Sequence, residues 1–158
     1  MGRAAGSVVS VRMMLLGVLL VVVVYRRRLP DGVASYTDGV DIWLDDRLNE
    51  VQEKCAIAHE MVHVERGHSR AQPEAVEMSV RFETAMRLLP LETLFEGCRR
   101  GGSLAVIARN LGVTRQVLMD RAATLSDQQA EVAGCGSCRA CPVMQARMVQ
   151  HPAYARVA

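Results

Sequence analysis

A histidine pair in the middle of the chain constrains the fold more than any other feature. His59 and His63 frame Glu60 in the pattern H-E-x-x-H. A spacing of four residues puts both imidazoles on one face of an α-helix, where they can bind the same small cation. Glu60 follows His59 and therefore points about 100° further round the helix axis. There it is close enough to take a proton from water held by that cation without being a ligand. The motif therefore predicts a helix that carries a metal site.

The flanking residues mark both ends of this helix. Asn49 followed by Gln52 is a capping box, which predicts a helix start near Glu50. Gly67 is a typical residue for the C-terminal stop. The expected core stripe is Val51, Cys55, Ala58 and Val62. Because the helix is largely apolar, two histidines and a glutamate on it need polar partners, and a metal ion is the simplest partner.

A site of this kind needs a third protein ligand. The longer motif H-E-x-x-H-x-x-G-x-x-H does not fit, because Arg66 occupies its glycine position and Ser69 its third histidine. His68 is therefore not expected to be a ligand. The remaining candidates are carboxylates further along the chain, which spacing alone does not rank: Glu74, Glu77 and Glu83.

The N-terminal residues are apolar but do not read as a membrane span. Arg12 and Arg26 bracket thirteen uncharged residues, whereas a spanning helix needs about 20. No small-residue cleavage site of a signal peptide follows. We expect a short apolar helix from Met13 to about Leu20 that leads into a buried strand at 20–25. A membrane or export segment is the alternative.

The rest of the chain predicts an α+β domain. Val40, Ile42 and Leu44 alternate with polar residues, as in a half-buried strand. Helices are expected from about residue 73 to 89, from 91 to 99, and as a two-helix hairpin at 104–125. We expect an N-terminal segment at 1–20, one domain at 21–125 and a tail at 126–158 that carries Cys135, Cys138 and Cys141.

Two segments permit other functions. Residues 104–125 also have the pattern of a helix-turn-helix, whose recognition helix would begin at Thr114, Arg115 and Gln116. A net charge of +2 does not support nucleic-acid binding, so a hairpin that packs on the domain is favoured. The three tail cysteines are expected to be reduced and idle, with a second metal or redox site as the alternative. An odd count of five cysteines fits a reducing compartment.

The histidine segment and the following "VEMSVRFETAMRLLPLETL" resemble the ImmA/IrrE metallo-endopeptidases, especially short forms from actinobacteria and phages. The likeness covers about residues 21–125. The family's second helix reads roughly E-x-x-A-[DN]-x-F-A-x-x-L-L-x-P, and Glu77 falls at its glutamate. The resemblance therefore implies Glu77 as third ligand, as in gluzincins. Arg81 stands at the Asp or Asn position that supports a ligand histidine, and Glu83 stands at the Phe position.

This resemblance implies a zincin-like domain with a short sheet, the histidine helix, a glutamate helix and a C-terminal hairpin. It implies Zn²⁺, or Mn²⁺, bound by His59, His63 and Glu77, with Glu60 as catalytic base. The implied activity is cytoplasmic cleavage of a helix-turn-helix repressor of a phage or mobile element, without nucleic acid or membrane as partner. The alternatives are a DNA-binding regulator with a structural metal and an inactive pseudoprotease that only binds the repressor. Tyr36 and His68 are candidate oxyanion donors.

Overall fold

The structure is a computed structural model that describes residues 8–15 and 18–130. Within those residues it contains six helices and a four-stranded sheet, so the predicted α+β class is confirmed. The chain divides into two compact units, Met1–Val80 and Arg81–Ala158. The cysteines expected in the tail, Cys135, Cys138 and Cys141, lie outside the described residues.

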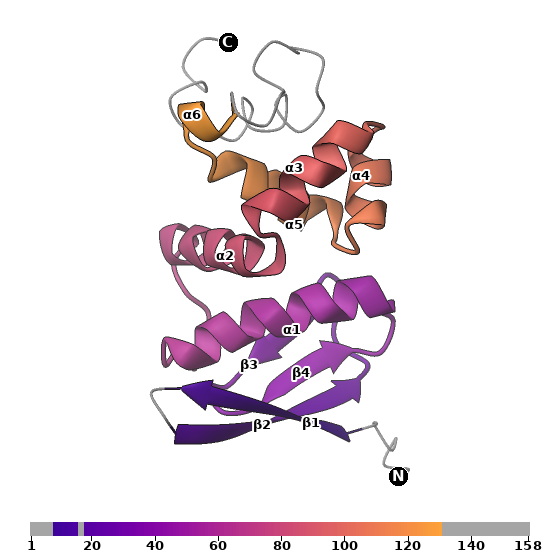
Figure 1. The fold of residues 1–158 in the computed structure, drawn as a ribbon. Coiled ribbons are helices and arrows are strands. Elements are labelled where there is room, and N and C mark those ends of the chain that lie inside the picture. Colours follow the sequence, from indigo (N-terminus) through magenta and orange to yellow (C-terminus); the bar gives the residue numbers. More distant parts are fainter. Residues whose placement is uncertain (1–7, 16–17, 131–158) are drawn as a thin grey trace. The chain divides into compact units, whose positions relative to one another are not determined.

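The first unit contains the sheet (Figure 1). In chain order its strands are β1 (Val8–Leu15), β2 (Val18–Arg27), β3 (Ser35–Thr37) and β4 (Ile42–Asp45). Their order in the sheet is β1-β2-β4-β3, with β1 antiparallel to β2, β2 parallel to β4, and β3 antiparallel to β4. The short strand β3 is therefore an edge strand.

The N-terminal residues form a β-hairpin. Val8 of β1 pairs with Tyr25 of β2, and the pairing continues to Leu15 and Val18. The expected strand at 20–25 is confirmed, but the expected helix from Met13 to Leu20 is wrong, because residues 13–15 belong to β1 and residues 18–20 to β2. The reason is the density of valine, whose branched Cβ is stiff in a helix and fits the pleated surface of a strand.

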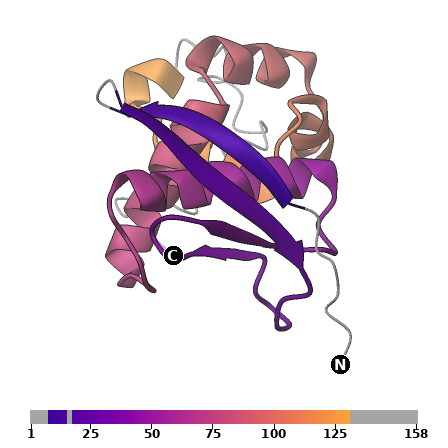
Figure 2. The same cartoon turned by 90° about the horizontal axis from the view of Figure 1, so that it is seen from below.

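Helix α1 (Glu50–Glu65) covers one face of the sheet (Figures 1 and 2). The core between them is aliphatic and consists of Val22, Val24, Ile42, Leu44, Met61 and Val64. The predicted alternation holds for Ile42 and Leu44, whereas Val40 is 61% exposed because it lies in the turn before β4. On the other face of the sheet, Trp43 stacks between Tyr25 and Tyr36, with ring centroids 5.5 and 4.9 Å away.

Both ends of α1 are built by local hydrogen bonds. The Asn49 side chain accepts from the Gln52 backbone N–H, and the Gln52 side chain accepts from the Asn49 N–H, each at 3.0 Å. The predicted capping box is thus confirmed. At the other end Gly67 has φ +69°, a conformation that favours glycine. Of the expected core stripe, Cys55 and Val62 are buried and the other two residues are half-buried.

Four of the remaining helices follow the predicted order, and the last lies in the segment that was expected to be the tail. Their bounds are α2 (Glu74–Leu88), α3 (Leu91–Arg100), α4 (Leu104–Asn110), α5 (Arg115–Ala123) and α6 (Asp127–Ala130). The boundary between the two units falls inside α2, after Val80. Gly112, with φ +62°, joins α4 to α5 at the predicted place. No helix in the described part of the chain is both long and apolar enough to cross a membrane.

Helix α5, the candidate recognition helix, is largely buried. Six of its nine residues are buried, among them Asp120 and Arg121. Asp120 accepts from both Arg81 and Gln116, and the Arg121 Nε donates to the Leu89 carbonyl at 2.7 Å. A recognition helix needs an exposed polar face that can reach base edges. Arg115 and Gln116, two of the three residues expected to begin a recognition helix, are exposed, so this burial does not decide between the two interpretations of residues 104–125.

Candidate metal centre

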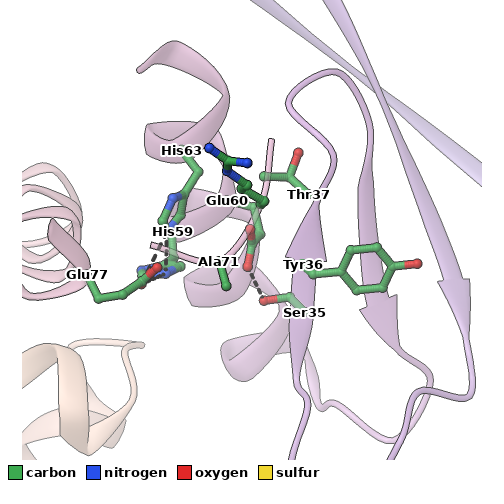
Figure 3. A pocket seen from close by; sticks show the side chains of 9 residues that line it. Ser35, Tyr36, Thr37, His59, Glu60, His63, Ala71 and Glu77 are labelled. Atoms are coloured by element: carbon green, nitrogen blue, oxygen red, sulfur yellow. Dashed lines mark hydrogen bonds and ion pairs between the residues drawn. The ribbon is translucent and has the colours of Figure 1, made fainter. Parts of the chain in front are cut away.

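Helices α1 and α2 bring the three candidate ligands together (Figure 3). The Nε2 atoms of His59 and His63 lie 3.1 Å apart. The Oε2 atom of Glu77, in the first turn of α2, lies 3.5 Å from the former and 3.3 Å from the latter. Of the other two candidate carboxylates, Glu74 is exposed and Glu83 pairs with Arg87. The structure groups Glu77 with the two histidines.

The spacing of these donor atoms fits a single metal ion. Two ligands at about 2.0–2.1 Å from a tetrahedral zinc lie about 3.3 Å from each other. The three separations of 3.1, 3.3 and 3.5 Å bracket that value. Two imidazoles and one carboxylate are also a ligand set of catalytic zinc sites, which keep a fourth position open. The His59, His63 and Glu77 group could therefore hold a metal ion.

A pocket of about 260 Å³ opens beside the three donors. It is lined by Ser35, Tyr36, Thr37, His59, Glu60, His63, Arg70, Ala71 and Glu77. Strand β3 supplies one wall, and the loop between α1 and α2 supplies Arg70 and Ala71. The volume is below the roughly 300–1,000 Å³ of typical small-molecule pockets.

Glu60 is a buried acid beside the donor group. Its side chain lies in the pocket, where Oε1 accepts a 2.7 Å hydrogen bond from the Ser35 hydroxyl (Figure 3). The residue is only 6% exposed, and this burial raises the pKa of Glu60 to about 7, with a smaller contribution from the charge of Glu77. A carboxyl group with a pKa near neutrality can both take and return a proton under physiological conditions.

His63 is held in the neutral form that a metal ligand requires. It is 5% exposed, and burial lowers its pKa because the imidazolium would lose its hydration. Its Nδ1, on the side of the ring away from the other donors, lies 3.0 Å from Nδ1 of His68. Neutral imidazole is the form that binds zinc, so little proton displacement opposes metal binding at this residue.

The two candidate oxyanion donors do not face the open side of the site. The Tyr36 ring stacks on Trp43 and extends away from the histidines, and its hydroxyl accepts from Arg27 (Figure 3). His68 contacts the back of His63 and does not line the pocket. The residues that sequence reasoning missed are Ser35 and Arg70. No local pattern marks Ser35, because it is 25 positions from Glu60 and meets it only through the fold.

Glu60 should make the metal-free protein less stable as the pH rises. The folded state keeps the Glu60 proton up to about pH 7, whereas the unfolded chain releases it near 4.5. The free energy of unfolding should therefore fall by about 3 kcal/mol across that interval. Glu60→Gln removes this loss, so denaturation with a chelator present, at about pH 8, should find the variant more stable than the wild type.

Comparison of the two proteins isolates this effect. His63 has a lowered pKa, so it reduces stability as the pH falls, which is the opposite direction. That contribution is common to both proteins and cancels in the difference between them. Equal stability of the wild type and the variant at both ends of the pH range would show that Glu60 is not desolvated.

Removal of Glu77 should abolish tight metal binding. Loss of a residue that only supports a ligand costs about 10–100-fold in metal affinity, and loss of a ligand itself should cost more. Zinc titration against a chromophoric chelator should therefore find Glu77→Ala weakened by over about a hundredfold. Glu74→Ala, on the same first turn of α2 but exposed, is the matched control and should bind zinc normally. Full zinc retention by Glu77→Ala would exclude the ligand set.

Comparisons of the chain with protein-family models, with curated proteins and with solved structures gave no match. Three observations support a metal centre: the spacing of the His59, His63 and Glu77 donor atoms, the buried acid Glu60 and the adjoining pocket.

Proposed function

We propose that this chain is a zinc-dependent endopeptidase with a zincin-like domain, similar to the ImmA/IrrE family. The observation that carries the proposal is the set of three donors at ligand spacing with a buried glutamate next to them. Zn²⁺ is the proposed ion because two neutral imidazoles and a carboxylate suit it, and Mn²⁺ is the alternative.

The catalytic role falls to Glu60. When bound, the ion supplies Lewis acidity, which activates water and polarises a substrate carbonyl. The Ser35 hydroxyl donates a hydrogen bond to Glu60 Oε1. The other carboxyl oxygen, Oε2, then accepts a proton from the attacking water. The same carboxyl group then returns that proton to the leaving amine, and its raised pKa suits both steps.

Arg70 is the cation that lines the pocket. Among residues 8–15 and 18–130, its guanidinium group has no carboxylate partner. A guanidinium group offers several fixed donors and stays charged at all relevant pH values. We assign Arg70 to the negative charge that develops on the carbonyl oxygen of the substrate, the role considered from sequence for Tyr36 and His68.

Strand β3 supports a polypeptide as the substrate class. It lies at the edge of the sheet, and in the part of the chain that is described it pairs only with β4. An extended peptide can add to such an edge through backbone hydrogen bonds. Because Ser35, Tyr36 and Thr37 of β3 also line the pocket, a peptide added there would pass the donor group.

The partner and compartment follow from the resemblance. We propose a helix-turn-helix repressor of a phage or mobile element as the protein substrate, and the cytoplasm as the compartment. Among the described residues Cys55 is a buried free thiol, which agrees with a reducing environment.

Glu60→Gln should separate metal binding from catalysis. The amide can still accept from Ser35, so zinc affinity should stay close to that of the wild type. Loss of proton transfer should lower kcat by about 10²–10⁴-fold. The measurement is mass spectrometry of a peptide library incubated with zinc-loaded protein, with Glu74→Gln as a matched exposed control. Equal cleavage by Glu60→Gln would refute the mechanism, and binding without cleavage by the wild type would indicate a pseudoprotease.

Arg70 should affect the chemical step more than substrate binding. Loss of one donor to the oxyanion typically costs about 10²–10³-fold in kcat. Arg70→Ala should show such a fall with little change in KM, and Arg70→Lys should recover part of it. Arg28→Ala, which removes an exposed arginine paired with Asp46, is the control. An increase in KM alone would instead assign Arg70 to ground-state binding.

A further inference from the structure

The C-terminus of α1 brings His68 against His63. His63 is the third residue from the end of the helix, and its carbonyl accepts from the His68 N–H at 2.9 Å. The Gly67 N–H donates to the Val64 carbonyl at 3.0 Å. These two bonds, with Gly67 at φ +69°, form a Schellman motif. Such a motif returns the chain onto the last helical turn, so the side chains of its first and last residues meet.

At this end of α1 the two side chains that meet are imidazoles. Their ring centroids are 5.1 Å apart with an interplanar angle of 60°, and the two Nδ1 atoms are 3.0 Å apart. A hydrogen bond between two nitrogens needs a proton on one and a lone pair on the other. One of the two imidazoles therefore donates this hydrogen bond and the other accepts it.

The metal-ligand role proposed for His63 decides which imidazole donates the hydrogen bond. A ligand nitrogen must present a lone pair, and Nε2 is the nitrogen of His63 that lies beside His59 and Glu77. Neutral His63 has one N–H, which must then be on Nδ1. His63 Nδ1–H therefore donates to Nδ1 of His68, whose own proton is on Nε2.

We propose that His68 is a positioning residue that fixes the tautomer and the ring orientation of His63 for metal binding. The inference rests on the proposed metal centre. In most metal sites a carboxylate, a backbone carbonyl or water accepts the second N–H of a ligand histidine. Here Nδ1 of a second imidazole does so, and the turn that ends the ligand helix places it there.

The turn between β3 and β4 holds His68 in this place. Gly39 has φ +96°, and a Cβ added there would lie 3.2 Å from Cβ of Ser69 and 3.4 Å from the His68 carbonyl. The turn thus packs directly against the backbone of His68 and Ser69. His68 itself is half-buried. Its backbone is therefore held from two sides, by the Schellman motif and by this turn.

Two variants of the same shape test the role. His68→Asn retains an acceptor at the place of Nδ1, whereas His68→Leu has the same branching and no acceptor. Leucine also suits this position, because Schellman motifs commonly have an apolar contact there. Chelator competition should find zinc bound about 10–100-fold more weakly by His68→Leu, with His68→Asn close to the wild type. Thermal unfolding without metal should show that both variants fold.

The tautomer can be observed directly in the wild type. Nitrogen–proton correlation NMR of the zinc-loaded protein should show His63 protonated on Nδ1 and His68 protonated on Nε2. Equal zinc affinity of His68→Leu and the wild type would overturn the inference while leaving the metal centre intact. Equal weakening by both variants would overturn the acceptor role. A wild type that binds no zinc would overturn the proposed function together with this inference.

Discussion

Burial of polar groups on α1 is the constraint on which the rest of the site depends. One side of this helix supplies Met61 and Val64 to the core against the sheet, and Glu60 and His63 are almost equally buried. An acid or an imidazole removed from water without a partner costs several kcal/mol. Every such group here meets a specific partner within 3.5 Å: Ser35 for Glu60, and both Glu77 and His68 for His63. The chemistry of the site follows from these pairings.

The partner side chains, Ser35, His68 and Glu77, come from three separate segments that contact α1. Local sequence signals account for the positions of two of them. Pro73 precedes α2, and its carbonyl accepts from the Glu77 N–H, so Glu77 is held in the first helical turn. Gly67 permits the turn that returns His68 to the helix. Ser35, by contrast, reaches Glu60 through the pairing of β3 with β4. The proposed catalytic acid and metal ligands are thus positioned by helices and a strand, which favours the fixed geometry that the proposed hydrolysis needs.

Sequence reasoning recovered what depends on local chemistry and missed what depends on pairing. The capping box and Gly67 placed both ends of α1, and the spacing of four residues placed His59 and His63 on one face. Resemblance, and no spacing rule, singled out Glu77. The hairpin of β1 and β2 was missed because an apolar run reads equally as helix or strand until its pairing partner is known. The contact of His63 with His68 was predictable, since the Schellman motif joins residues at that spacing.

Arg81 illustrates how a departure from a family pattern can be compensated. It stands where the resemblance places an acceptor for a ligand histidine, and a guanidinium group can only donate. In the structure Arg81 instead pairs with the buried Asp120. Both residues belong to the second unit. Because His68 can accept the His63 N–H, the metal centre does not need an acceptor at residue 81. The proposed ligands, the proposed base Glu60 and the proposed support His68 all lie between residues 59 and 77, so the first unit alone contains the whole of the proposed metal centre.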